Sequence, residues 1–340
     1  MKIASEQQLE DVLARPTEAD IEAMRELDGD LLILGVAGKM GPSLAHRARL
    51  ASDAAGVKRR IIGVARFSQP IWRRQLEEWG IECVPADLLE PGALDKLPDA
   101  PNVIHMAARK FGSTGAESLT WAMNTYLPAM VAQRYRASRI VAFSSGNVYP
   151  LTPVLLGGPT EQDATGPVGE YAQSVMGRER MFEHFSAQYG TRVVLLRLNY
   201  AIELRYGVLA DIARKVYGRC PIDLRMGHAN VIWQGDANSV CLRCFAHCQA
   251  PPLILNLTGP ETLSVRWVAT QFARRFGVEP VLEGTESPTA LLSNAQHCCR
   301  LFGYPTVPVE QMMDWIAAWI EGGGSSLNKP THFEARDGKF

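Results

Sequence analysis

Three glycines at the spacing Gly35-x-x-Gly38-x-x-Gly41 stand where an apolar run gives way to a helical pattern. Glycine lets the chain turn sharply and lets backbone N–H groups approach a ligand, and a helix beginning there favours negative charge. In dinucleotide-binding folds such a loop holds a pyrophosphate. Because a predicted strand precedes the loop, a helix follows it and a second strand comes about 20 residues later, we predict a dinucleotide site.

The end of the next predicted strand bears on the form of this dinucleotide. An acidic residue there would bind the ribose 2′-hydroxyl of NAD, but the strand ends in Val64-Ala65-Arg66. Arg66 and Lys39 are placed to meet a 2′-phosphate, which favours NADP over NAD, unless both are solvated loop cations. Asp87, after the third predicted strand, is expected either to bind the adenine amino group or to cap the next helix.

The elements around this loop alternate between continuous apolar strands and helices, which is typical of a parallel sheet covered on both faces. Strands are predicted at 31–36, 60–65, 81–84, 102–107, 139–143 and 192–197, and helices at 42–55, 72–79, 117–136 and 171–189. The expected fold is therefore an α/β, Rossmann-type, doubly wound parallel sheet with a smaller C-terminal substrate lobe.

The same pattern suggests four regions. A helical extension at 1–28 is expected to pack outside an NAD(P)-binding domain at 29–198, and 199–321 is expected to be mainly a substrate-binding lobe, interleaved with the last sheet strands. The tail at 322–340 is either a mobile end or a strap over the body.

Composition excludes several classes of partner. The chain has 340 residues, 46% of them hydrophobic, and a net charge of −1 with both signs interspersed, so neither nucleic acid nor a membrane surface is expected to bind it. No apolar run approaches the roughly 20 residues of a membrane span, and no secretory signal is visible. Seven cysteines, an odd number, fit a reducing compartment, so we expect a soluble, cytoplasmic protein.

One cluster of potential metal ligands needs a separate interpretation. Cys241, Cys244, His247 and Cys248 fall in a segment that is expected to be one buried helix, without a second ligand pair at a zinc-like spacing. We therefore predict no metal site.

Jointly, the motifs resemble the extended branch of the short-chain dehydrogenase/reductase superfamily, the NAD-dependent epimerases/dehydratases. The resemblance covers roughly Leu31 to Ile320, and it rests on the glycine loop, Val103-Ile104-His105-Met106-Ala107-Ala108, Asn124, Phe143-Ser144-Ser145-Gly146-Asn147-Val148-Tyr149, Tyr171-Ala172-Gln173-Ser174 and the run from Asn256 to Val265. It implies a homodimer paired through the helices at 117–136 and 171–189. It also implies cofactor contacts from Gly35, Gly38, Lys39, Met40, Gly41, Arg66, Asp87, Leu88, Ala107, Ala108 and Asn124.

By position, the resemblance gives Tyr171 as the proton donor or acceptor at the substrate oxygen and Ser145 as the residue that holds this oxygen. The family's lysine, four residues after the tyrosine, is replaced by Val175. Without a nearby cation a phenol, whose pKa is about 10, is a poor base at neutral pH. Lys110 is our first candidate for the missing charge, because UDP-galactose epimerases resemble this chain in having a lysine there. Arg178 is the second, although a surface ion pair is the simpler interpretation of it.

The resemblance also bears on the substrate. Alanine stands where nucleotide-sugar enzymes have an arginine for the phosphates, at Ala229, and Gly146-Asn147 replaces the Asp-Glu pair of dehydratases. The alanine disfavours a nucleotide sugar, whose diphosphate would lack a cationic partner. The missing carboxylate pair disfavours a dehydration. We predict a small sugar, sugar acid or similar carbonyl compound as substrate. Its candidate contacts are Asn147, Tyr149, Asn199 and Arg205, each of which could instead make hydrogen bonds within loops.

The leading functional hypothesis is therefore an NAD(P)-dependent oxidoreductase that acts on a small carbohydrate-like alcohol or ketone by hydride transfer. An epimerase that retains its NAD(P) is one alternative. A non-catalytic NAD(P)-binding sensor or scaffold is the other, and Val175 is the reason to keep it.

Overall fold

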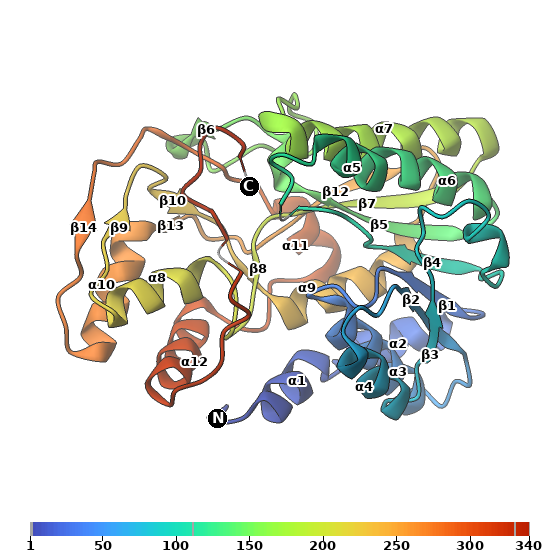
Figure 1. The fold of residues 1–340 in the computed structure, drawn as a ribbon, viewed down its shortest axis with the longest axis horizontal. Helices are drawn as coiled ribbons and strands as arrows, with labels where there is room; N and C mark the ends of the chain where they lie inside the picture. The colour runs from blue at the N-terminus through green and yellow to red at the C-terminus, as the bar shows by residue number, and fades with distance from the viewer. Residues whose placement is uncertain (1–2, 111, 330, 340) are drawn as a thin grey trace.

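The fold comes from a computed structural model, and the structure describes residues 3–110, 112–329 and 331–339. Within them, a seven-stranded parallel sheet has the order β12-β7-β5-β4-β1-β2-β3 (Figure 1). Its strands are β1 Leu31–Leu34, β2 Ile61–Ala65, β3 Glu82–Pro85, β4 Asn102–His105, β5 Arg139–Ser145, β7 Arg192–Leu198 and β12 Leu253–Leu257. The predicted Rossmann-type sheet is confirmed.

Helices cover both faces of the sheet because its strands are apolar on both sides. In β1, Leu31 and Ile33 pack into one core cluster and Leu32 and Leu34 into another, as the two-residue repeat of a strand requires. The helices of this body are α3 Gly41–Ala54, α4 Pro70–Glu78, α5 Glu117–Trp121, α6 Leu127–Arg134, α7 Gly169–Tyr189, α9 Gln234–Arg243 and α11 Gln296–Phe302, with the 3-10 turns η1 Leu94–Lys96, η3 Gly146–Val148, η4 Val154–Leu156 and η5 Cys244–His247.

The long helix predicted at 117–136 is interrupted. A π-helical turn, η2 Ala122–Tyr126, separates α5 from α6. Such turns inside α-helices are often found at functional sites. Here the turn contains Asn124, whose side chain is fully buried.

A second lobe packs around its own apolar core (Figure 1). Its helices are α8 Val208–Tyr217, α10 Val265–Phe276 and α12 Val309–Glu321. Its short strands pair with one another in four two-stranded sheets. They are β6 Thr152–Pro153, β8 Ala201–Ile202, β9 Ile222–Asp223, β10 His228–Ala229, β11 Ile232–Trp233, β13 Leu263–Ser264, β14 Leu282–Glu283 and β15 Thr289–Ala290.

The N-terminal helices α1 (Glu6–Ala14) and α2 (Glu18–Glu26) pack against the outer helices α3 and α9. A buried ion pair fixes α2, because Arg47 of α3 lies 2.6 Å from Asp20. Leu9 and Leu13 of α1 also join the core of the second lobe. The extension therefore ties the two lobes together.

The described part of the C-terminal tail is a strap rather than a loose end. Beyond α12 it crosses the face of the molecule between the two lobes (Figure 1). Thr331 donates to Asp211, Phe333 is buried, and Arg336 donates to Thr289. Within the described residues, every helix is too short or too polar to span a bilayer.

Candidate functional site

The glycine loop between β1 and α3 leaves no room for side chains at two of its positions. Gly35 has φ +93°, and a Cβ there would lie 2.6 Å from the backbone nitrogen of Ala107. A Cβ on Gly41 would lie 2.0 Å from the carbonyl oxygen of Val36. The loop thus packs backbone against backbone at the N-terminus of α3, which is the geometry that binds a pyrophosphate.

A cavity of about 230 Å³ opens beside this loop, along the carboxyl ends of β1, β2 and β4. It brings together the greater part of the predicted cofactor residues, namely Gly35, Gly38, Arg66, Asp87, Leu88, Ala107 and Ala108. We call it the cofactor cavity. Its position at the carboxyl ends of parallel strands and its backbone cradle both fit a dinucleotide.

We expect Gly41→Ala to raise the dissociation constant for NAD or NADP at least about tenfold, because the new methyl group would displace the cradle. Titration of intrinsic fluorescence with each nucleotide measures the change. Gly56→Ala, just beyond the C-terminal end of α3, is the control, since its Cβ would meet nothing within 4 Å and the strain at its φ of +70° lies outside the glycine loop. Equal affinity in wild type and Gly41→Ala would mean that the phosphates bind elsewhere.

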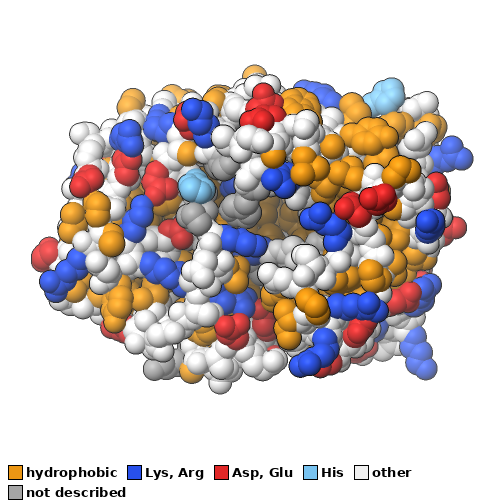
Figure 2. Space-filling model, in the orientation of Figure 1, with side chains coloured by type: hydrophobic (Ala, Val, Ile, Leu, Met, Phe, Trp, Pro, Cys, Tyr) orange, Lys and Arg blue, Asp and Glu red, His pale blue; other side chains and the backbone are white. Residues whose placement is uncertain are grey.

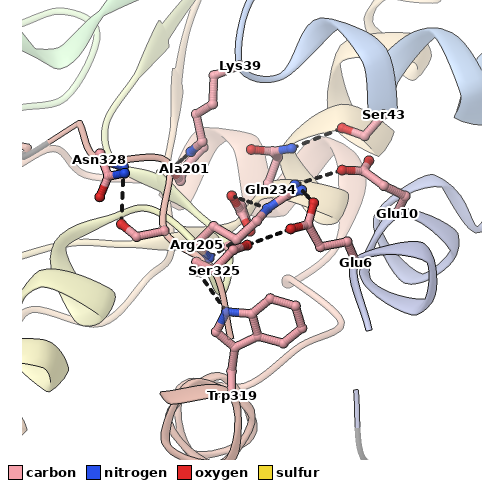
Figure 3. A network of polar contacts seen from close by, with 12 residues as sticks. Glu6, Glu10, Lys39, Ser43, Ala201, Arg205, Gln234, Trp319, Ser325 and Asn328 are labelled. Carbon is pink, nitrogen blue, oxygen red and sulfur yellow. Dashed lines mark hydrogen bonds and ion pairs between the residues drawn. The ribbon is translucent and has the colours of Figure 1, made fainter. Parts of the chain in front are cut away.

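Lys39, two residues before α3, departs from its predicted place. Its Nζ donates to the carbonyl oxygen of Ala201 at 2.7 Å and lies 4.1 Å from the ring centre of Tyr206. The side chain therefore points toward the second lobe (Figure 3) and not toward Arg66 and a ribose phosphate. The sequence locates the glycine loop, but it does not fix the direction in which the flexible Lys39 side chain leaves it.

A second cavity, of about 150 Å³, lies between the sheet and the second lobe; we call it the tyrosine cavity. It is lined by Lys39, Met40, Lys110, Ser144, Ser145, Asn147, Tyr171, Leu198, Asn199, Tyr200, Ala201, Tyr206, Gly207 and Thr331. All three predicted catalytic residues are among them. So are Asn147 and Asn199, two of the four predicted substrate contacts.

The phenol of Tyr171 is hydrogen-bonded to the side chain of Ser145. Burial raises the pKa of Tyr171, while the charge of Arg178 and the Ser145 hydrogen bond oppose this shift. The phenol is therefore protonated at neutral pH and is suited to donate a proton. Lys110 lies 5.9 Å from the Tyr171 ring centre, and desolvation lowers the pKa of Lys110 to about 8.

Comparison with known proteins identifies the family of this chain. The model of the NAD dependent epimerase/dehydratase family matches residues 31–202. The chain belongs to this family. No curated protein sequence matches the chain.

Several solved structures share the fold of this family member at low sequence identity. Pal from Bacillus thuringiensis is 17% identical, with a TM-score of 0.71 over 86% of this chain and 99% of its own. The UDP-glucuronic acid 4-epimerase from Bacillus cereus, in complex with UDP-glucuronic acid and NAD, is 15% identical with a TM-score of 0.70, over 86% and 99%. The dTDP-glucose 4,6-dehydratase from Bacillus anthracis, in complex with NAD, is 15% identical with a TM-score of 0.71, over 86% and 97%.

In this member of the epimerase/dehydratase family, Arg178 lies inside the fold and not on the surface, where an ion pair was expected. Its side chain is buried, donating to the carbonyl oxygen of Phe143 at 2.6 Å and to Asn124 Oδ1 at 2.9 Å. The interpretation as a surface ion pair is therefore wrong. The family's lysine position holds the uncharged Val175. The charge on α7 that acts on the Tyr171 phenol is therefore that of the buried Arg178.

Asn124 was predicted to contact the cofactor, but the structure gives it a positioning role. Its amide donates to Ser174 and to the carbonyl oxygen of Arg109, and its Oδ1 accepts from the Arg109 N–H. These bonds fix the loop that carries Lys110. Asn124 does not line the cofactor cavity.

Tyr149 and Arg205, the other two predicted substrate contacts, are used inside the fold. The hydroxyl of Tyr149 bonds to Asn256 at 2.9 Å. Arg205 donates to Glu10 at 2.7 Å and pairs with Glu203 (Figure 3). Neither residue lines the tyrosine cavity, so the alternative of internal hydrogen bonding is right for both.

Several residues that line the tyrosine cavity were not predicted from the sequence, among them the hydroxyl-bearing Tyr200, Tyr206 and Thr331. The first two follow the carboxyl end of β7, where ligands of open α/β sheets bind, and this position could have signalled them. Thr331 comes from the tail, and nothing in the local sequence indicates that the strap passes here.

Proposed function

We propose that this chain is an NAD(P)-dependent oxidoreductase acting on an alcohol or ketone of a small carbohydrate-like molecule. The observation that carries the proposal is the hydrogen-bonded pair Ser145–Tyr171 in a cavity next to the cofactor cavity. When bound, the nicotinamide supplies or accepts the hydride at the substrate carbon.

The residues of the tyrosine cavity would handle the substrate oxygen. In reduction, Ser145 donates a hydrogen bond that orients the carbonyl oxygen, and the protonated Tyr171 gives its proton to that oxygen as the carbon gains a hydride. In oxidation, the same phenol must first lose its proton, which its raised pKa disfavours at neutral pH. The charge of Arg178 favours the phenolate, and Lys110, whose Nζ lies 5.9 Å from the ring centre of Tyr171, is a second cation in the same cavity.

The test is turnover of NADH and NADPH with a panel of ketoses, sugar lactones and keto acids, followed by absorbance of the reduced nicotinamide. Consumption of reduced nicotinamide in proportion to a reduced product is the expected result. A protein that binds the cofactor but turns over nothing in either direction would instead be the sensor or scaffold. Arg178 argues against this outcome, because it supplies a positive charge beside Tyr171 although Val175 does not.

An epimerase that retains its cofactor is the second candidate. It is favoured by the structural similarity to a UDP-glucuronic acid 4-epimerase in complex with NAD. Such an enzyme would purify with nucleotide bound and would release no reduced nicotinamide, which the absorbance of the purified protein shows directly. Two observations disfavour a nucleotide-sugar substrate. Ala229 cannot pair with the phosphates, and the tyrosine cavity is small.

The preference for NADP rests on Arg66 alone, since Lys39 points elsewhere. Arg66 is exposed at the cofactor cavity, 3.8 Å from Asp87. We expect Arg66→Ala to weaken NADP binding about tenfold, the value of a solvent-exposed charged hydrogen bond, and NAD binding less than about threefold. Nucleotide titration measures both, with Arg74→Ala as an exposed control. Equal weakening of NAD and NADP would argue against a 2′-phosphate contact.

A homodimer through α5–α6 and α7 stays part of the proposal. Leu119 and Tyr126 of this region are exposed hydrophobic side chains, which supports an interface there. Sedimentation of the purified protein tests it.

A further inference from the structure

Two lysines from different loops reach the tyrosine cavity. Lys39 comes from the glycine loop, and Lys110 comes from the loop after β4. The Lys110 Nζ lies 5.9 Å from the ring centre of Tyr200 as well as that of Tyr171. Among the described residues that line the cavity there is no aspartate or glutamate. The hollow near the middle of the face in Figure 2 has Lys and Arg side chains at its rim.

The carboxylates closest to Lys39 are engaged by other groups. Glu203 is paired with Arg205, which donates to it from the side chain and from its backbone N–H. Asp211 accepts from the hydroxyl and the N–H of Thr331. The hydrogen bond that Lys39 itself makes is to a neutral backbone carbonyl.

This arrangement is electrostatically costly when nothing is bound. Desolvation lowers the pKa of Lys39 to about 7; the charges of Lys110 and Arg205 lower it further, and those of Glu203 and Asp211 oppose the shift. An anion between the two ammonium groups would offset both the desolvation and the mutual repulsion. The fold therefore holds two cations in a form that an anionic ligand stabilises.

We propose that the substrate carries a carboxylate, which binds between Lys39 and Lys110 while its hydroxyl or keto oxygen reaches Ser145 and Tyr171. This inference rests on the proposed oxidoreductase function and narrows its substrates to small hydroxy or keto acids, sugar acids among them. Lys39 would then determine specificity and Lys110 would contact the substrate directly.

The cofactor's own phosphates are the other anion to consider. The glycine loop offers them backbone N–H groups at the N-terminus of α3, whereas the Lys39 side chain leaves the loop toward Ala201. Substrate and phosphate binding are separated by measuring cofactor affinity and acid affinity on the same variants.

The experiment uses the full chain saturated with oxidised cofactor and titrated calorimetrically with matched pairs: galacturonate and galactose, gluconate and glucose, glycerate and glycerol. We expect at least one acid to bind at least tenfold more tightly than its neutral partner. Lys39→Gln and Lys110→Gln should each reduce this preference at least tenfold while cofactor affinity changes less than twofold. Lys96→Gln, on the exposed η1 turn, is the matched control and should change neither.

Proton uptake gives a readout independent of activity. At pH 8, Lys39 is mostly neutral in the free protein, because its pKa is about 7. A bound carboxylate raises this pKa, so binding should take up as much as one proton, seen as a buffer-dependent heat that Lys39→Gln removes.

The outcomes separate the two proposals. The carboxylate inference fails if acids and their neutral partners bind equally, or if no acid of the panel has a dissociation constant below roughly 10 mM, the weak limit of calorimetry. In that case reduction of a neutral ketose would still support the proposed oxidoreductase function. If Lys39→Gln weakens the cofactor and leaves the preference for acids unchanged, Lys39 serves the phosphates and the inference is wrong. Tight acid binding without turnover of any acid or ketone would contradict the proposed function instead.

Discussion

Tyr171→Phe is expected to lower the turnover number for carbonyl reduction by about 100-fold to 10,000-fold, the contribution of a positioned general acid. The tyrosine ring is buried and packs with Val148, Tyr149 and Val175. Phenylalanine keeps this packing and removes only the hydroxyl that bonds to Ser145. The variant should therefore stay folded and bind the cofactor with a dissociation constant within about twofold of that of the wild type. The loss of turnover is then confined to the chemical step.

Steady-state kinetics with the best ketone of the panel measure the effect. Tyr200→Phe is the matched control, because the Tyr200 phenol lines the same cavity but lies outside the family motif that begins at Tyr171. This substitution should lower the turnover number less than about tenfold. A turnover number unchanged by Tyr171→Phe would remove Tyr171 from the mechanism and leave only the binding role of the cavity.

The pH dependence follows from the direction of the Tyr171 shift. Its pKa is raised, so the donor form needed for reduction is present throughout neutral pH, and reduction should not fall through loss of this proton below about pH 9. Oxidation needs the phenolate, whose fraction rises about tenfold per pH unit below the pKa, so the rate of alcohol oxidation should increase toward alkaline pH. An oxidation rate that falls from pH 7 to 9 would contradict this assignment.

The sheet was predictable from sequence because its strands are buried on both faces and therefore read as continuous apolar runs. The runs at 31–36 and 60–65 give strands at Leu31–Leu34 and Ile61–Ala65. The glycine loop was predictable for a related reason, since backbone contact at Gly35 and Gly41 permits no side chain. In both cases the constraint is visible in the residue type itself, as apolar side chains in the strands and as glycine where backbone meets backbone.

The charged residues of the site were harder to place because their partners are far apart in the chain. Lys39 bonds to a carbonyl 162 residues away, and Arg205 bonds to Glu10, 195 residues away. Local spacing shows which face of a helix Arg178 occupies, but it does not show that Phe143 and Asn124 provide oxygen atoms for it. Long flexible side chains choose among distant acceptors, so their direction follows from the tertiary fold.

A buried ion pair beneath the tyrosine cavity, between Glu179 of α7 and Arg197 of β7, is the second large expected effect. The guanidinium lies 2.7 Å from the carboxylate, and both side chains are at most 3% exposed. Ser144 also donates to Glu179, and Arg197 donates to Tyr149 at 2.7 Å. The pair thus joins α7, which carries Tyr171, to the strand ends that carry Ser145 and Asn199.

Arg197→Met is expected to destabilise the fold by about 3–5 kcal/mol, because it leaves the Glu179 carboxylate buried without its cation. Urea unfolding followed by circular dichroism measures the loss. The double variant Arg197→Met/Glu179→Leu removes both charges and should be more stable than Arg197→Met alone, since an apolar pair of similar volume tolerates burial. If the double variant were less stable than the single one, the carboxylate would be satisfied by Ser144 and its other neighbours, and the ion pair would not be what holds α7 to β7. Arg180→Met, which breaks an exposed pair with Glu183 on the same helix, should cost less than about 1 kcal/mol.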